Sequence, residues 1–319
     1  MPIGEFGLIE RHFTGRGARR ADVRIGVGDD AAVVVPPAGL EVVLALDTIV
    51  SGVHFPADMA PQFVGHRALA VNLSDISAMG AEPAWALLGL TLPAADEDWV
   101  AEFSRGLDEL ARRHGVALVG GDTTRGPLTA SVMLAGTLPA GAALLRSGAR
   151  AGDDIWISGT PGDAGAGLAI LQGRLEAPGD ARDELLRRFL LPEPRVALGR
   201  ALRGLASACI DVSDGVAGDL EKLCAASGAG GEIEAAELPL SPALLAAAGA
   251  ERALRFALAS GDDYELLFTA RRESRTAIGA LAAGAGCRRI GTVTAGAGVR
   301  VRGAALPRDA GHGFDHFGG

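Results

Sequence analysis

Six short motifs of this sequence place acidic side chains where chemistry could be done. A solvated turn would explain any one of them, because Asp is a common turn residue. Six motifs, each at an expected strand end or helix start, instead predict carboxylates that converge on one site. Carboxylates about 5 Å apart would repel by about 3 kcal/mol at an effective dielectric constant of about 20, so the site would need cations. The motifs are GDD at 28–30, LDT at 46–48, NLSD at 72–75, GGDTTRG at 120–126, DVSDG at 211–215 and SGDDYE at 260–265.

Carboxylate oxygen is the ligand type that Mg²⁺ prefers, with Mn²⁺ as a substitute. Magnesium in proteins usually shares its coordination between one or two carboxylates and the phosphates of a substrate. Asn72 and Asp75 are spaced i, i+3 in an expected helix, which places both side chains on one face. The pattern predicts an enzyme that holds magnesium ions against nucleotide phosphates. The aspartates expected to converge are Asp30, Asp47, Asp75, Asp122 and Asp211.

The basic residues exclude the common lysine-based phosphate sites. Of the 30 Lys and Arg residues, only Lys222 is a lysine. A Walker A loop needs Gly-Lys-Ser/Thr, and a protein kinase needs a strand lysine beside a Gly-rich loop. Lys222 follows Glu221 in an expected helix, so it fits neither pattern, and Arg125 and Arg146 are the candidate phosphate clamps. Backbone N–H groups could approach phosphate oxygens at Gly120, Gly121, Gly126 and the PGDAGAG loop at 161–167.

Four other residues have open interpretations. His54 follows the second acidic strand, and a structural role is as compatible with its position as a ligand role. Tyr264 lies between two acidic residues at a strand start, which suggests that it anchors a loop. Phe314 and Phe317 make the C-terminal segment aromatic where a disordered terminus would be polar, so we expect both to pack.

The elements that must position these residues alternate between helix and strand. Two α/β domains with α+β layers are expected, because 319 residues exceed what one core usually organises. The Gly/Ala/Pro-rich loop near 139–152 separates an expected domain at 1–140 from one at 150–319. Helices are expected at 5–13, 61–79, 96–114, 164–172, 183–205 (two, split at Pro192 and Pro194), 214–227 and 272–285. Strands are expected within 26–35 and 41–47, and at 83–92, 116–119, 128–138, 154–158, 207–211 and 264–269.

Charge and cysteine content narrow the class of protein further. The formal net charge of −9 argues against nucleic acid and anionic membranes as partners. The uncharged stretch 126–145 is interrupted by two prolines and two glycines, so we expect no membrane span, and the acidic N-terminus does not read as a signal peptide. Cys209, Cys224 and Cys287 form no CxxC pair, which favours a reducing compartment, the cytoplasm.

Eight motifs are distributed along most of the sequence in a fixed order. They are GEFGLIERHF, GVGDDAAV, LDTIVSGVHF, ALAVNLSDISAMGAEPAWALL, GGDTTRGPL, RSGARAGDDIWISGTPGDAGAGLAIL, IDVSDGVAGDL and SGDDYELLF. In this order they resemble the motifs of thiamine-monophosphate kinases, in the superfamily that includes aminoimidazole ribonucleotide synthetase.

The resemblance implies a two-domain α/β fold whose N-terminal domain binds ATP and magnesium and forms a homodimer. It implies the reaction of ATP with thiamine monophosphate to give ADP and thiamine diphosphate. The implied magnesium ligands are Asp30, Asp47, Asp75, Asp122 and Asp211, with Asp214 as a further one. The implied ATP contacts are Gly121, Asp122, Arg146 and Ser213, and the implied thiamine monophosphate contacts are His54, Asp262 and Phe314.

The sequence departs from the family pattern in three ways. Ala45 and Leu46 stand where the family often has hydroxyl residues, so a metal contact there would need backbone carbonyls. Asp262 replaces a usual glutamate and is one methylene shorter. Phe314 replaces a larger or hydroxylated aromatic residue, which preserves stacking but loses a hydroxyl contact.

The implied acceptor is a phosphate oxygen that is already ionised near neutral pH, so no catalytic general base is expected. Other ATP-using enzymes of the superfamily remain an alternative. Selenophosphate synthetases rely on an N-terminal cysteine or selenocysteine and a lysine, whereas the first cysteine here is Cys209. Hydrogenase-maturation relatives end in a cysteine, whereas this sequence ends in Gly319. A non-catalytic magnesium or nucleotide sensor is the alternative from another class.

Overall fold

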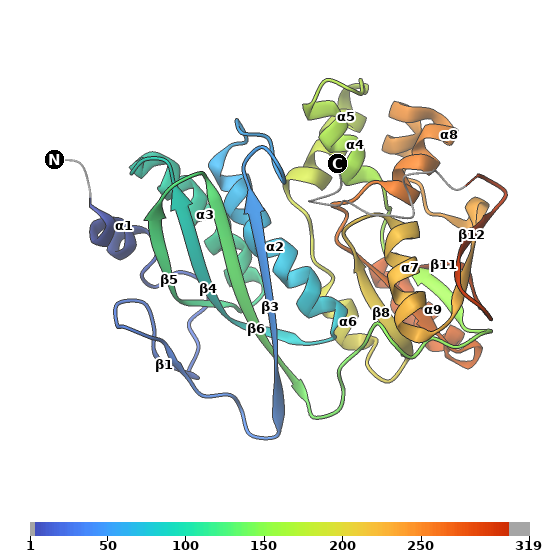
Figure 1. The fold of residues 1–319 in the computed structure, drawn as a ribbon, viewed down its shortest axis with the longest axis horizontal. Coiled ribbons are helices and arrows are strands. Elements are labelled where there is room, and N and C mark those ends of the chain that lie inside the picture. Colours follow the sequence, from blue (N-terminus) through green and yellow to red (C-terminus); the bar gives the residue numbers. More distant parts are fainter. Residues whose placement is uncertain (1–3, 306–319) are drawn as a thin grey trace. The chain divides into compact units, whose positions relative to one another are not determined.

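A computed structural model of the chain describes residues 4–305. The chain forms two compact units. Unit 1 comprises Met1–Ile76 and Ala81–Gly141, and unit 2 comprises Ser77–Gly80 and Ala142–Gly319. Both units combine helices with β-sheet, which confirms the predicted α/β class (Figure 1).

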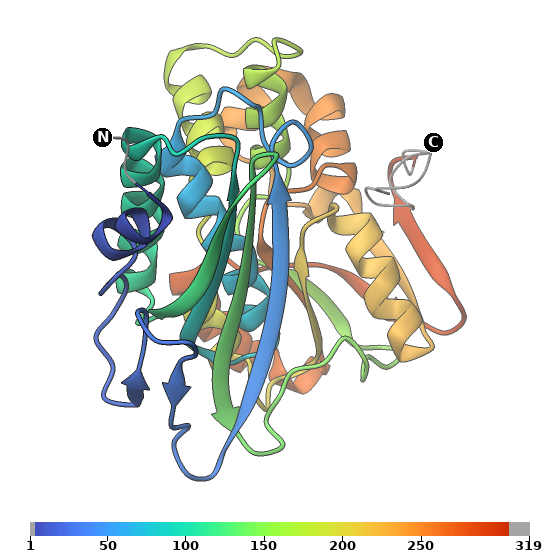
Figure 2. The same cartoon turned by 60° about the vertical axis from the view of Figure 1, so that its left-hand side comes forward.

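Unit 1 is built on a four-stranded sheet of order β3-β6-β4-β5. β3 and β4 are antiparallel to β6, whereas β4 and β5 are parallel. Helices α2 and α3 cover one face of this sheet (Figure 2). The elements are β3 (Leu40–Val50), β4 (Glu82–Leu92), β5 (Ala117–Arg125), β6 (Thr129–Pro139), α2 (Pro61–Ala78) and α3 (Glu97–Arg113).

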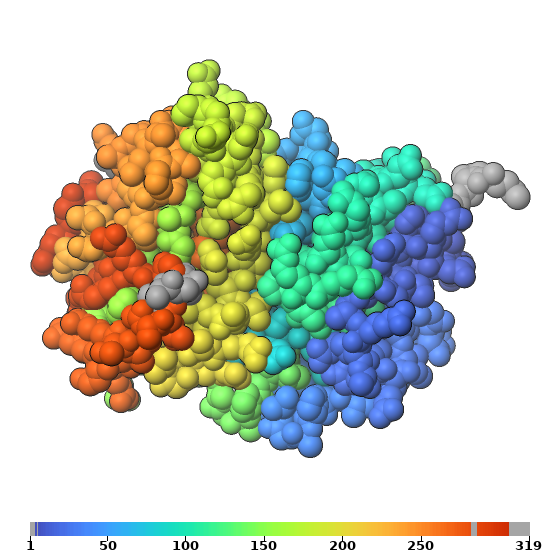
Figure 3. Space-filling view, turned by 180° about the vertical axis from the view of Figure 1, so that it is seen from behind, coloured from blue at the N-terminus to red at the C-terminus, as the bar shows by residue number. Residues whose placement is uncertain are grey.

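Helix α3 shows how the sequence positions these layers. Its buried residues recur at helical spacing, and Asp96 caps its start by accepting a 3.1 Å hydrogen bond from the N–H of Trp99. Helix α1 (Glu5–His12) packs on α3, where the Ser104 hydroxyl donates to the carbonyl of His12. Figure 3 shows these N-terminal residues in blue against the blue-green surface of α3.

Strand β3 has two different faces. Residues at alternate positions point to opposite faces of a sheet. Val42, Leu44 and Leu46 are exposed on one face, with Leu44 and Leu46 each 66% exposed. Asp47 is part-buried on the other face. The Leu46 side chain therefore points away from the face that carries Asp47.

The first predicted β-rich run, 26–35, is mostly not strand. Its only strand is β2 (Val33–Val34), which pairs with β1 (Val23–Ile25), just before the run, as a short antiparallel ribbon. The GDD motif lies in the connection between them.

Unit 2 contains a six-stranded sheet of order β12-β9-β11-β7-β10-β8, antiparallel except for the β12–β9 pair. Side chains of α7 and α8 pack on one face, and side chains of α6 and α9 on the other. The strands are β7 (Asp154–Ile157), β8 (Ala206–Val212), β9 (Gly230–Glu234), β10 (Glu265–Ala270), β11 (Arg288–Thr294) and β12 (Gly298–Arg302). The helices are α4 (Asp163–Leu171), α5 (Gly179–Leu190), α6 (Val196–Ala201), α7 (Val216–Ser227), α8 (Pro242–Ala259) and α9 (Arg275–Ala285), with short 3₁₀ turns at Ala235–Glu237 and Arg272–Ser274.

Strand β5 is longer than predicted, because it continues through the GGDTTR segment to Arg125. Gly121 and Asp122 are therefore strand residues, paired with Leu88 and Gly89 of β4, and not loop residues. The uncharged stretch 126–145 contains β6 and loops, and no helix within residues 4–305 has both the length and the apolar character to cross a membrane.

Candidate active site

The centre of the candidate site in unit 1 is the contact between Asp47 of β3 and Asp75 of α2. The Asn72 side-chain oxygen accepts a 3.0 Å hydrogen bond from the Asp47 N–H, and the two carboxyl groups are hydrogen-bonded to each other. Burial raises the pKa of Asp47, and the hydrogen bond with Asp75 opposes that rise. The i, i+3 spacing of Asn72 and Asp75 correctly predicted that both reach one place.

This pair fits a divalent cation by its donor set. Two carboxyl groups in contact cannot both stay ionised unless a cation offsets their repulsion; otherwise they share a proton. Hard carboxylate oxygens are the ligands that magnesium takes. Within residues 4–305, no group of three or more His, Cys, Asp or Glu side chains lies close enough to hold an ion alone. The wider five-aspartate cluster therefore stays a prediction.

His54 has a defined structural contact. Its Nδ1 accepts a 3.0 Å hydrogen bond from the backbone N–H of Val50, which fixes the ring beside the end of β3. The nitrogen that accepts this bond carries no proton. The structural role that the sequence left open is thus present, and a contact with substrate remains a prediction.

Gly121 and Asp122 occupy the exposed part of β5. A Cβ atom on Gly121 would lie 2.0 Å from the carbonyl oxygen of Leu88, so only glycine allows the two strands to approach here. A cavity of about 640 Å³ adjoins this segment, and its lining includes the next residues, Thr123–Arg125. Asp30 is exposed in the β1–β2 connection, where its N–H bonds to the Asp29 carboxylate at 2.9 Å.

In unit 2 the site residues lie in the turn between β8 and α7. Asp211 is buried near the end of β8, and Ser213 and Asp214 follow it. One carboxylate oxygen of the buried Asp219 accepts from the N–H groups of Ser213 and Asp214, at 3.0 and 2.9 Å. Lys222 donates to the carboxylates of both Asp214 and Asp219. Sequence reasoning missed Asp219 and set Lys222 aside.

The turn before β10 brings Asp262 next to Ser213. The Asp262 N–H donates to the Ser213 carbonyl at 3.1 Å, and the Tyr264 hydroxyl donates to the Asp262 carboxylate at 3.0 Å. Asp262 and Tyr264 have φ angles of 69° and 51°, which side chains other than glycine rarely adopt. A Cβ on Gly261 would lie 1.9 Å from the Ser213 carbonyl. Tyr264 anchors this turn, as predicted.

The PGDAGAG loop differs from its prediction. Asp263 accepts from the N–H of Gly162 at 2.7 Å and from the N–H of Ala164 at 3.2 Å. Burial raises the pKa of Asp263 well above its usual range. These two N–H groups at the start of α4 thus bond to a buried carboxyl group of the chain, so the prediction that they approach phosphate oxygens is wrong for them.

A second buried acid, Glu265, supports the same region. Arg188 donates to it at 2.6 Å, Arg195 at 2.5 and 2.6 Å, and the Ser158 hydroxyl at 2.5 Å. Burial alone would raise the pKa of Glu265, but the two guanidinium groups and the hydroxyl outweigh burial and lower it. The sequence did not predict this network, because residue type does not show whether an acidic side chain is buried or exposed.

For the remaining predicted residues, the described part of the structure shows no common location. Arg146 is exposed, and its carbonyl accepts a 3.1 Å hydrogen bond from the Ser227 hydroxyl. Phe314 and Phe317 lie outside the described residues.

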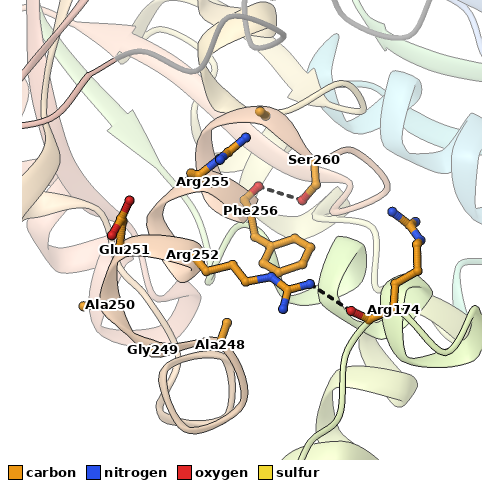
Figure 4. Close-up of a pocket in the computed structure, with 10 residues that line it drawn as sticks. Arg174, Ala248, Gly249, Ala250, Glu251, Arg252, Arg255, Phe256 and Ser260 are labelled. Carbon is orange, nitrogen blue, oxygen red and sulfur yellow. Dashed lines mark hydrogen bonds between the residues drawn. The ribbon is translucent and has the colours of Figure 1, made fainter.

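A larger cavity in unit 2, of about 700 Å³, is lined by Arg174 and residues of α8 (Figure 4). The Arg252 guanidinium lies 5.6 Å from the Phe256 ring centroid and donates to the Arg174 carbonyl at 2.9 Å. None of its lining residues is a predicted site residue. Cavity size alone therefore does not locate the site.

Comparison with known proteins assigns this architecture. Residues 28–138 match the family model of the AIR synthase related protein N-terminal domain, and residues 150–304 match that of the C-terminal domain. The two units and the acidic site thus define a protein of the AIR synthase related class.

Within that class the similarity is specific. The thiamine-monophosphate kinase of Escherichia coli K12 is 48% identical over 280 residues, covering 87% of this chain and 86% of the relative. The chain belongs to the thiamine-monophosphate kinase family. A crystal structure of this kinase from Stenotrophomonas maltophilia K279a superposes with a TM-score of 0.85 at 46% identity, over 90% of this chain and 93% of that one. The structure of AaThiL complexed with AMPPCP and TMP superposes with a TM-score of 0.78 at 33% identity, over 87% and 89%.

Proposed function

We infer that this chain uses ATP to phosphorylate thiamine monophosphate, giving thiamine diphosphate and ADP. The observation that carries the inference is the Asp47–Asp75 carboxyl contact, in a chain that aligns with thiamine-monophosphate kinases along most of its length. A relative in the family binds both AMPPCP, an ATP analogue with a methylene in place of the β–γ bridging oxygen, and TMP. With ATP in place of its analogue, this pair of ligands is the substrate pair proposed for this chain.

The reaction is a direct in-line transfer. An oxygen of the acceptor phosphate forms a bond to the γ-phosphorus of ATP, and the bond from that phosphorus to the β–γ bridging oxygen breaks. The electron pair leaves with ADP. Because the acceptor oxygen is already ionised, no proton must be removed, and catalysis depends on positioning and charge. In the proposed site Gly121, Asp122, Arg146 and Ser213 position ATP, and His54, Asp262 and Phe314 position thiamine monophosphate.

Magnesium, when bound, would neutralise the phosphate oxygens of both substrates. The residues proposed to hold it are Asp30, Asp47, Asp75, Asp122, Asp211 and Asp214. Asn72 keeps Asp47 in place, and Asp219 and Lys222 do the same for Asp214.

We propose that the protein is a homodimer that associates through unit 1. The support is the row of Val42, Leu44 and Leu46 on the exposed face of β3. Exposed apolar rows of this kind are typical of protein interfaces. The acidic net charge supports the proposal that neither nucleic acid nor a membrane is a partner, and the absence of a CxxC pair supports a cytoplasmic location.

The direct test is incubation of the protein with ATP, Mg²⁺ and thiamine monophosphate, followed by chromatography. We expect thiamine diphosphate and ADP in equal amounts. ADP without thiamine diphosphate, or neither product, would contradict the proposed function and favour another enzyme of the superfamily or a nucleotide sensor.

A further inference from the structure

The single lysine of the chain lies at the turn that carries Ser213 and Asp214. Lys222 is also the only Lys or Arg between Arg203 and Arg252, in a stretch that contains several acids. Everywhere else this chain uses arginine as its permanent cation. Lysine and arginine are not interchangeable where the geometry of the donors matters.

The Lys222 contacts explain why shape matters here. Its Nζ donates to Asp219 Oδ1 at 2.8 Å and to Asp214 Oδ2. An ammonium group directs three donors outward from one atom, so it can bridge two carboxylates that converge on a point. A guanidinium group is planar and presents its donors in a fixed fork.

Asp219 connects Lys222 to the backbone of the 213–214 turn. Its side chain is almost fully buried, and its other oxygen, Oδ2, accepts from the N–H groups of Ser213 and Asp214. Lys222 and Asp219 are spaced i, i+3 on α7, so the helix itself holds the ammonium group in register. Lys222 therefore constrains the side chain of Asp214 directly and its backbone through Asp219.

We infer that Lys222 is a positioning residue that holds the 213–214 turn, and with it the Asp214 carboxylate, in the conformation that receives the magnesium–nucleotide complex. The inference rests on the proposed function insofar as it takes Asp214 as a magnesium ligand and Ser213 as an ATP contact. The Lys222 side chain is 41% exposed, so substitutions there should not prevent folding.

The first test needs no ligand. In Lys222→Met the N–H groups of Ser213 and Asp214 should exchange with deuterium at least about tenfold faster than in the wild type, because a charged partner of Asp219 is lost. Lys222→Arg should also exchange faster, because a guanidinium group cannot take the same bridging position. Arg187→Met is the matched control, since it removes an exposed i, i+3 ion pair with Glu184 on another helix. Wild-type exchange in Lys222→Met, or full restoration by Lys222→Arg, would overturn the inference.

The second test measures AMPPCP binding by calorimetry while MgCl₂ is varied. The half-saturating Mg²⁺ concentration should rise about tenfold in Lys222→Met and Lys222→Arg, as is typical when a residue behind a metal ligand is lost. An unchanged Mg²⁺ dependence would overturn the inference. If the wild type itself binds no AMPPCP at any Mg²⁺ concentration, the proposed function fails, whereas the exchange experiment still decides whether Lys222 positions the turn.

Discussion

The backbone N–H of Asp47 donates to the side-chain oxygen of Asn72, a residue buried within α2. β3 is an edge strand of the unit 1 sheet, so a helix side chain, and not a neighbouring strand, satisfies this N–H. Asn72 also donates to the carbonyl of Ala68 at 3.1 Å, which fixes the orientation of its amide.

Asn72→Ala should therefore lower the free energy of unfolding by about 1–3 kcal/mol, because it leaves a part-buried N–H without its partner. It should also slow thiamine diphosphate formation, since Asp47 loses its anchor. Urea denaturation and the chromatographic assay measure the two effects. Thr48→Ala is the control on the same strand, where an exposed hydroxyl pairs with Ser131. Equal stabilities of the two variants would contradict the role given to Asn72.

Asp75→Asn should separate activity from stability. It removes one of two carboxylates in contact, so thermal stability should stay the same or rise, while turnover should fall by at least about 100-fold. Asp30→Asn and Asp122→Asn should also abolish turnover with the fold intact. Asp98→Asn, at the exposed start of α3, should change neither quantity. Wild-type rates in Asp75→Asn, Asp30→Asn and Asp122→Asn would contradict the proposed magnesium site.

Asp154 gives a pH-dependent prediction. It is fully buried, and Arg275 and Arg289 both donate to its carboxylate. Burial alone would raise the pKa of Asp154, but the two guanidinium groups lower it. A folded-state pKa below the unfolded value means that this stabilisation is present above about pH 4 and is lost as the pH falls through the folded-state pKa.

Asp154→Asn should cost about 1–3 kcal/mol of unfolding free energy at neutral pH, and the difference from wild type should shrink towards about pH 2. Urea unfolding across this range measures the difference. Glu109→Gln, which removes an exposed ion pair on α3, should shift stability by less than about 1 kcal/mol throughout. A difference for Asp154→Asn that is independent of pH would show that its ion pairs do not carry the effect.

Leu46→Glu should prevent association, because it would place a charge within the apolar row on β3. Size-exclusion chromatography with light scattering should show a dimer for the wild type and a monomer for the variant. Leu245→Glu, at an exposed position on α8, should leave the mass unchanged. A monomeric wild type, or a dimeric Leu46→Glu, would contradict the proposed interface.

Local patterns in the sequence were enough to predict much of the fold. α3 has clear helical periodicity, α2 has a helical composition, and β3, β4 and β6 are long apolar or alternating runs. α8 received no prediction, because it is rich in alanine and interrupted at Gly249, whose φ is 69°. β5 was cut short because its glycines suggest a loop, whereas the close approach of Gly121 to Leu88 requires a glycine within the strand.

The site divides in the same way. That Asn72 and Asp75 reach the same place followed from helical spacing, because both lie on one helix face. The contact of Lys222 with Asp214 depends on how the chain turns between β8 and α7, which no local pattern encodes. The hydrogen bonds from the N–H groups of Gly162 and Ala164 to Asp263 depend on the burial of that carboxyl group, which residue type does not reveal.

The lone lysine at this turn also affects how the protein can be handled. Amine-reactive reagents have only Lys222 and the α-amino group to attack in this chain. Coupling to an amine-reactive sensor surface would therefore tether many molecules by the side chain that bonds to Asp214, and such a surface would under-report nucleotide binding. Immobilisation through a terminal tag, or binding measured in free solution, keeps the turn intact.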